Sequence, residues 1–134
     1  MKIVVLKFGG TSVGTIQKIK KVAEIISNYK KKKYKVIVVS SAMSGVTNDL
    51  VKKSKEISET FSETEYDVLV SSGEQISCSL IAGRLLNNGI KSRSWLAWQI
   101  PIFTKGSHRN SRIHFVNKNK IIKYLKDGGV PIIA

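Results

Sequence analysis

A lysine and two glycines follow the first apolar segment of the chain. Residues 3–6 are all aliphatic and predict a buried strand; Lys7-Phe8-Gly9-Gly10 follows at once, and a helical pattern begins near Thr15. Glycines let backbone N–H groups approach an anion, and a helix N-terminus adds positive potential. A lysine at the carboxyl end of a strand adds a cation where open α/β sheets bind ligands. The order of strand, glycine turn and helix is typical of a phosphate-binding turn, although an ordinary strand-to-helix turn with a solvated lysine has the same pattern.

Two later polar stretches also follow apolar ones. Residues 36–39 predict a second buried strand, which continues into the small-residue loop 40–47. Serine hydroxyls and free N–H groups in such a loop suit phosphate or carboxylate oxygens, but they also suit an N-capping cluster for the next helix. The third stretch, residues 71–77, places Glu74 where we expect a helix to begin. A glutamate there ordinarily complements the helix dipole.

These three stretches, taken together, resemble the aspartate kinases of the amino-acid kinase family. They read Lys7-Phe8-Gly9-Gly10-Thr11-Ser12-Val13, Ser40-Ser41-Ala42-Met43 with Thr47, and Ser71-Ser72-Gly73-Glu74-Gln75-Ile76-Ser77. The first stretch contains neither the Gly-x-x-x-x-Gly-Lys-Ser/Thr nor the Gly-x-Gly-x-x-Gly nucleotide fingerprint. The resemblance therefore depends on three motifs in the family's order, and it extends over the whole chain.

The resemblance implies an activity and a set of site residues. The implied reaction is ATP-dependent phosphorylation of the β-carboxylate of L-aspartate, which begins biosynthesis of lysine, threonine, methionine and diaminopimelate. It implies Lys7 as the catalytic residue, with Thr47 and Glu74 binding aspartate. The residues implied to bind ATP phosphates are Lys7, Phe8, Gly9, Gly10 and Ser41. Mg²⁺ is expected with ATP as a substrate complex; we expect neither a metal site built from these residues nor a tightly bound cofactor.

Composition restricts the other function classes. The 134-residue chain carries 23 basic and 9 acidic residues, a formal charge of +14, which invites a nucleic-acid hypothesis. The lysines are dispersed over expected helix ends and loops, so we predict no specific nucleic-acid partner. His108 and His114 lack zinc-site spacing and are predicted to be structural or solvated. The single cysteine, Cys78, fits a reducing compartment, and no apolar run approaches the ~18 residues of a membrane span. A cytoplasmic location is expected.

The expected fold class is α/β, a three-layer α/β/α sandwich with a mainly parallel sheet: the amino-acid kinase fold, N-terminal portion. The periodicities predict strands near residues 3–6, 36–39, 90–95, 100–104 and 130–134. They predict helices over 16–29, 46–57 and 76–87, and one capped by Asn117, with connections over 60–65 and 105–112.

The resemblance also implies a longer protein. Aspartate kinases continue with a second glycine-rich motif, nucleotide-base contacts and regulatory domains, and they form homo-oligomers. Residues 1–134 are therefore expected to be a partial amino-acid kinase domain that self-associates or behaves as a loosely packed domain, and that lacks turnover alone. The alternatives are a non-catalytic remnant or interaction module of the same fold, and a basic nucleic-acid-binding protein.

Overall fold

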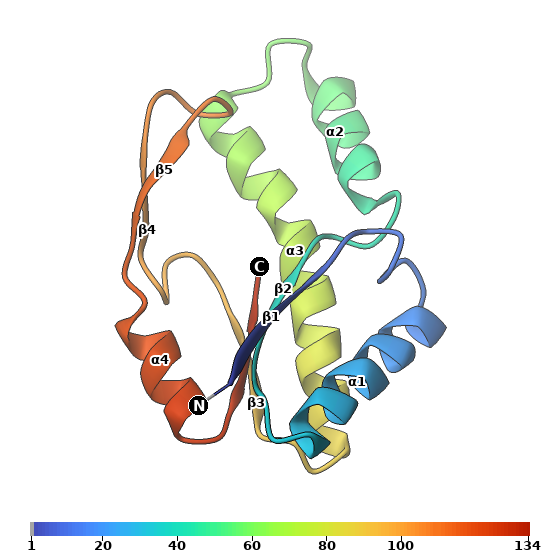
Figure 1. The fold of residues 1–134 in the computed structure, drawn as a ribbon. Coiled ribbons are helices and arrows are strands. Elements are labelled where there is room, and N and C mark those ends of the chain that lie inside the picture. The colour runs from blue at the N-terminus through green and yellow to red at the C-terminus, as the bar shows by residue number, and fades with distance from the viewer. Residues whose placement is uncertain (1) are drawn as a thin grey trace.

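Residues 2–134, which the computed structural model describes, form a parallel sheet, a separate antiparallel hairpin and helices around them (Figure 1). In chain order the elements are β1 (Ile3–Phe8), α1 (Ile16–Lys31), β2 (Lys35–Ser40), α2 (Val46–Ile57), α3 (Glu63–Asn87), β3 (Ser92–Trp95), β4 (Ile102–Lys105), β5 (Arg112–Val116), α4 (Asn119–Lys126) and β6 (Val130–Ile133). The parallel sheet has the order β1-β2-β6-β3, so the last strand lies between β2 and β3.

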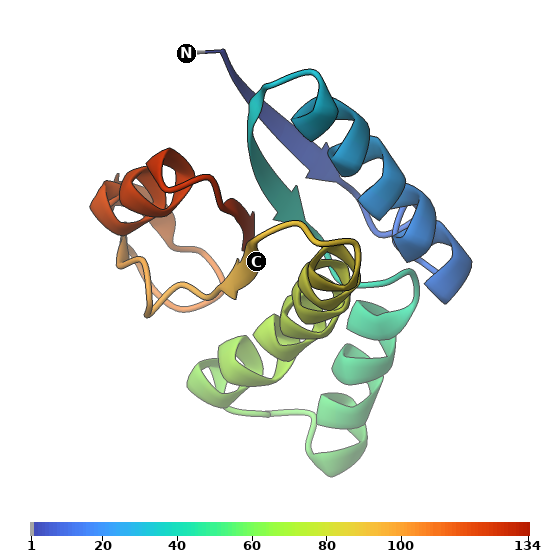
Figure 2. The same ribbon diagram turned by 90° about the horizontal axis from the view of Figure 1, so that it is seen from below.

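Alternating side chains place one apolar cluster on each face of the sheet. Val36 and Val38 belong to the cluster under α1 and α3, whereas Ile37, between them, packs with the cluster under α4. Ile132 and Ile133 divide in the same way. Figure 2 shows α1 and α3 on one side of the sheet and α4 on the other. The predicted three-layer α/β/α fold with a parallel sheet is therefore confirmed.

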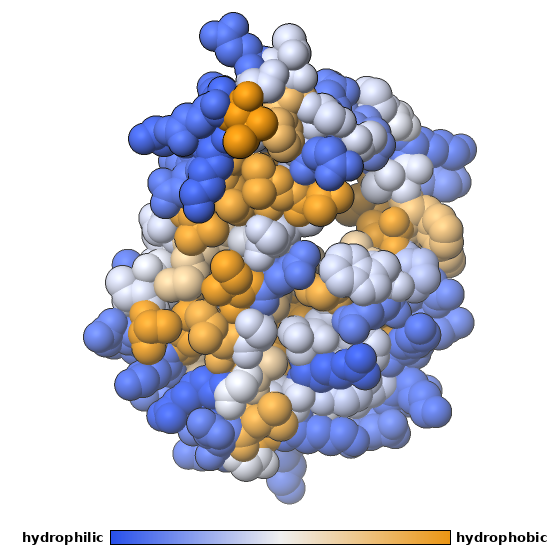
Figure 3. All heavy atoms as spheres, turned by 180° about the vertical axis from the view of Figure 1, so that it is seen from behind, coloured by the Kyte–Doolittle hydropathy of each residue, from blue (hydrophilic) through white to orange (hydrophobic). Residues whose placement is uncertain are grey.

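The longest helix, α3, is apolar on more than its inner face. Its inner side includes Cys78, Ile81 and Leu85, which are fully buried. Its outer side leaves four apolar residues exposed, namely Val68, Ile76, Leu80 and Leu86. From behind, hydrophobic side chains form a broken band from the top to the bottom of the molecule (Figure 3).

The predicted break before Glu74 is wrong, because α3 runs without interruption from Glu63 to Asn87. The two serines that suggested a loop are accommodated inside the helix. The Ser71 hydroxyl donates to the Val68 carbonyl at 2.9 Å, and the Ser72 hydroxyl donates to the Leu69 carbonyl at 2.7 Å. Serine hydroxyls that bond back one turn in this way have no need of a loop. Glu74 therefore lies in the middle of a helix and not at a helix start.

The short strand expected near residues 100–104 is found as β4, but it lies outside the parallel sheet. It pairs antiparallel with β5, which the sequence pattern did not reveal. At the helix starts, Thr15 caps α1, since its Oγ1 accepts from the Lys18 N–H at 3.2 Å. The expected cap of α4 is displaced by one residue: Lys118 is the N-cap, while Asn117 Oδ1 accepts from the Asn119 N–H. Over residues 2–134, no helix combines the length and apolar character needed to cross a bilayer.

Two neighbouring isoleucines of α1 provide a test of the helix orientation. Ile26 is fully buried, whereas Ile25 is 44% exposed. We predict that Ile26→Ala lowers the free energy of unfolding by about 2–5 kcal/mol, because it leaves a cavity in the core. The matched change Ile25→Ala should cost about 0.5 kcal/mol or less. Urea unfolding monitored by circular dichroism measures both values, and equal losses would contradict the packing of α1.

Candidate functional site

The strand ends bring the first two sequence motifs to one edge of the sheet. Phe8 of β1 is in register with Ser40 of β2, and Trp95 of β3 is in register with Ile133 of β6. The loops that follow β1 and β2 therefore leave from the same carboxyl edge. In open α/β sheets this edge is where ligands bind.

The loop after β1 packs against the loop after β2 through the backbone. The Ser41 N–H donates to the Phe8 carbonyl at 3.0 Å, and the Ser44 N–H donates to the Gly10 carbonyl at 3.2 Å. A β-carbon on Gly10 would lie 2.9 Å from the Ala42 carbonyl oxygen, closer than real β-carbons approach. Gly10 is therefore required by the close approach of the two loops.

Gly9 and Lys7 lie on the open side of the same turn. A β-carbon built on Gly9 would meet no atom within 4 Å, and the Ser12 N–H donates to the Gly9 carbonyl at 2.9 Å. Lys7 is the penultimate residue of β1 and is exposed. Its cation is thus available to a ligand at this edge.

Helix α3 contacts the loop after β2 at Gly73 and Glu74. Glu74 Oε1 accepts from the Ala42 N–H at 3.2 Å. A β-carbon on Gly73 would lie 2.9 Å from the Ala42 β-carbon, so the helix and loop meet with no room for a larger residue. One turn on, the Ser77 hydroxyl donates to the Ser41 carbonyl at 2.7 Å. These contacts fix the Glu74 carboxylate at the loop.

The structure thus brings Phe8, Gly10, Ser41 and Glu74 together: Phe8 contacts Ser41 directly, and Gly10 and Glu74 both contact the loop 41–44. Thr47 lies further along the chain. It is the half-buried second residue of α2, and Gly45, the N-cap of that helix, has a φ of 87°. Within residues 2–134, no hydrogen bond joins the side chain of Thr47 or Lys7 to Glu74, whose carboxylate accepts from the Ala42 N–H.

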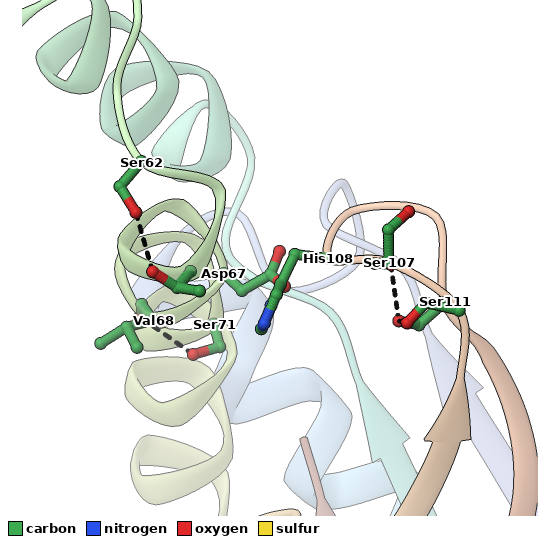
Figure 4. Close-up of polar contacts among 9 residues, drawn as sticks. Ser62, Asp67, Val68, Ser71, Ser107, His108 and Ser111 are labelled. Carbon is green, nitrogen blue, oxygen red and sulfur yellow. Dashed lines mark hydrogen bonds and ion pairs between the residues drawn. The ribbon is translucent and has the colours of Figure 1, made fainter.

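A cavity of about 480 Å³ lies beside Glu74. Its walls come from the first half of α3, the segment after β3, the last residue Ala134 and the tip of the β4–β5 hairpin. Glu74 is the one predicted site residue that lines it. Asp67 and His108 also line it, and the His108 Nδ1 and Asp67 Oδ2 atoms are 2.6 Å apart. Figure 4 shows both side chains between the hairpin tip and α3. Sequence reasoning missed this pair, since 41 residues separate its members and neither lies in a motif.

Cys78, one turn after Glu74, is not equipped as a nucleophile. Burial raises the pKa of its thiol to about 11, the nearby Glu74 carboxylate contributes in the same direction, and hydrogen bonding with Ser77 opposes the rise. The thiol is therefore protonated at neutral pH. Within residues 2–134 there is also no group of three or more His, Cys, Asp or Glu side chains that could hold a metal ion.

Comparison with known proteins places the chain in a family. The sequence model of the amino acid kinase family matches residues 2–134. The chain belongs to the amino acid kinase family. An aspartokinase of Rickettsia felis is 45% identical over 137 residues, which cover all of this chain and 34% of that protein. This amino acid kinase chain therefore spans about a third of the length of that relative.

Solved structures agree with the fold. The crystal structure of an aspartate kinase from Synechocystis superposes with a TM-score of 0.82 at 31% identity, covering 100% of this chain and 22% of that one. The structure of aspartokinase III of E. coli in complex with aspartate and ADP gives a TM-score of 0.78 at 18% identity, covering 99% of this chain and 40% of that one. At that identity the second likeness supports the amino acid kinase fold alone.

Two glycines of α3 test the close contact between this helix and the loop. Gly73→Ala should lower the free energy of unfolding by about 1–3 kcal/mol, because its β-carbon collides with Ala42. Gly83→Ala, whose β-carbon meets no atom within 4 Å, should raise it by about 0.5–1 kcal/mol through helix propensity. Urea unfolding of both variants makes the comparison. Stabilisation by both substitutions would show that α3 does not press on the loop.

Proposed function

We propose that residues 1–134 form the N-terminal part of an aspartate kinase domain, which transfers the γ-phosphoryl group of ATP to the β-carboxylate of L-aspartate. The observation that carries the proposal is the meeting of the three motif stretches at one sheet edge, through the Ser41–Phe8, Ser44–Gly10 and Ala42–Glu74 hydrogen bonds. Relatives named aspartokinase, and the aspartate kinase structure that is 31% identical to this chain, favour this member of the family over others.

The chemistry suits residues that position and neutralise charge. A carboxylate is ionised at neutral pH, so its oxygen attacks the γ-phosphorus without a general base. The new bond joins that oxygen to phosphorus, the bond from phosphorus to the β,γ-bridging oxygen breaks, and ADP leaves with the bond's electron pair. In the proposal, the Lys7 ammonium neutralises charge on the transferring group. Gly9, on the open side of its turn, and its neighbours offer N–H donors to the phosphates.

Glu74 supplies the negative group that an amino acid requires. Its carboxylate is held by the Ala42 N–H while it lines the cavity beside α3. In the proposal, Glu74 binds the α-ammonium of aspartate, Thr47 lies near the aspartate, and Ser41 lies near the ATP phosphates. Mg²⁺ would enter with ATP, and no step depends on a metal site formed by this chain, because its described residues offer none.

The rest of the kinase domain is proposed to lie in the sequence that relatives carry beyond this region, since the chain covers 34% of the Rickettsia felis protein. Aspartate-dependent ADP formation tests the proposal on residues 1–134 alone and joined to the remainder of such a relative. We expect turnover only in the joined protein, and there Lys7→Ala should lower kcat by about 10²–10³-fold. Lys20→Ala, an exposed lysine of α1, is the control. No aspartate-dependent turnover in the joined protein would refute the proposed reaction.

Selectivity for an amino acid should depend on Glu74. Glu74→Gln removes the negative charge while keeping the side-chain shape, so we expect aspartate affinity to fall by about 1.5–3 kcal/mol, the usual value of a charge-assisted hydrogen bond. ATP affinity should remain nearly constant. Glu65→Gln, the same change at an exposed position of α3, should alter neither. Isothermal titration calorimetry with aspartate and with ATP measures both affinities. Weaker ATP binding with unchanged aspartate binding would show that Glu74 contacts the nucleotide instead.

A further inference from the structure

The β4–β5 hairpin has little support of its own. Every residue of β5 is exposed, as are three of the four residues of β4, and the two strands pack chiefly against each other. A backbone hydrogen bond from the Asn117 N–H to the Pro101 carbonyl closes its base. An isolated two-stranded hairpin is marginally stable in water, so contacts at its tip must contribute to its position.

Two side chains of the tip contact neighbouring residues of α3. His108 Nδ1 lies 2.6 Å from Asp67 Oδ2, and the guanidinium of Arg109 lies 4.5 Å from the centre of the Tyr66 ring. The tip itself is shaped for these contacts. Arg109 has a φ of 64°, which a non-glycine residue adopts at an energetic cost, and the Ser111 hydroxyl donates to the Ser107 carbonyl at 2.7 Å (Figure 4).

The same tip forms a wall of the cavity that contains Glu74. His108 lines the cavity from the hairpin, while Asp67, Ser71 and Glu74 line it from successive turns of α3. The contact between His108 and Asp67 therefore joins two walls of the cavity. If the tip moved away from α3, the cavity would lose one side and be more exposed to water.

We propose that His108 and Asp67 are positioning residues for the ligand of the Glu74 cavity: their 2.6 Å contact, with Arg109 stacked on Tyr66, holds the hairpin against α3 and keeps this wall of the cavity in place. The inference rests on the proposed binding of aspartate at Glu74. Neither residue contacts the reacting atoms, so the pair acts on substrate affinity through the hairpin and not on the phosphoryl-transfer step.

Trypsin measures the position of the tip directly, because Arg109 is itself a cleavage site. We expect Asp67→Asn and His108→Gln each to speed cleavage after Arg109 by about three- to fivefold, in keeping with a half-exposed polar contact. Tyr66→Leu should act similarly through loss of the cation–π contact. His114→Gln, in the exposed β5 of the same hairpin, should leave the rate unchanged. Equal rates in the parent and all variants would overturn the proposed contact.

Aspartate binding supplies the second measurement. L-aspartate should slow cleavage after Arg109 in the parent, and calorimetry should give about three- to fivefold weaker aspartate binding for Asp67→Asn and His108→Gln. In the joined kinase the same variants should raise KM for aspartate and leave kcat and KM for ATP unchanged. Faster cleavage combined with unchanged aspartate affinity would overturn the positioning role.

The two proposals fail in different ways. If the parent and the joined kinase bind no aspartate, the proposed function and the positioning role are both wrong, whereas the cleavage rates still decide whether the contact between His108 and Asp67 holds the hairpin. If aspartate binds and responds to Glu74→Gln but not to His108→Gln, the proposed function stands and the positioning role is wrong.

Discussion

The site depends on the close approach of three backbone segments that are distant in sequence. The turn after β1, the loop after β2 and the middle of α3 meet where Gly10 and Gly73 leave no room for a β-carbon. This approach lets the Ala42 N–H reach the Glu74 carboxylate. It follows that small residues, more than the charged ones, set the geometry of the edge, because the charged groups are placed by the backbone behind them.

The separation of charge across this edge is a second consequence of the fold. The chain carries a formal charge of +14, yet the side chains that line the cavity include Asp67 and Glu74 and no lysine or arginine. Lys7, by contrast, lies at the end of β1, outside that cavity. The proposed function uses both regions, with phosphate oxygens near the lysine and the ammonium of an amino acid near the carboxylates.

Sequence patterns predicted the elements that are defined by local physics. Short runs of aliphatic residues predicted β1, β2 and β6, and the spacing of Ile19, Val22 and Ile26 predicted α1. Thr15 caps that helix through the N–H of a residue only three positions away. The sequence pattern was misread at one local feature, and it could not reveal contacts between segments that are distant in the sequence. The serines before Glu74 resemble a loop until their bonds to the preceding turn of α3 are known. Hairpin β4–β5 buries too little to leave an alternating pattern, and the pair of His108 with Asp67 joins segments that no local rule connects.

The place of β6 in the sheet has a consequence for biosynthesis. This strand is the last of the described elements to be made, yet it lies between β2 and β3, and its Val130 and Ile132 are fully buried. While a ribosome is still extending the chain, β1–β2 and β3 are two pieces with an unfilled slot between them, and the facing edges of β2 and β3 have no hydrogen-bonding partner. The nascent protein therefore cannot complete its core progressively from the N-terminus. The parallel sheet can be completed only after residues 130–133 have been made, and until then the unpaired edges of β2 and β3 favour aggregation.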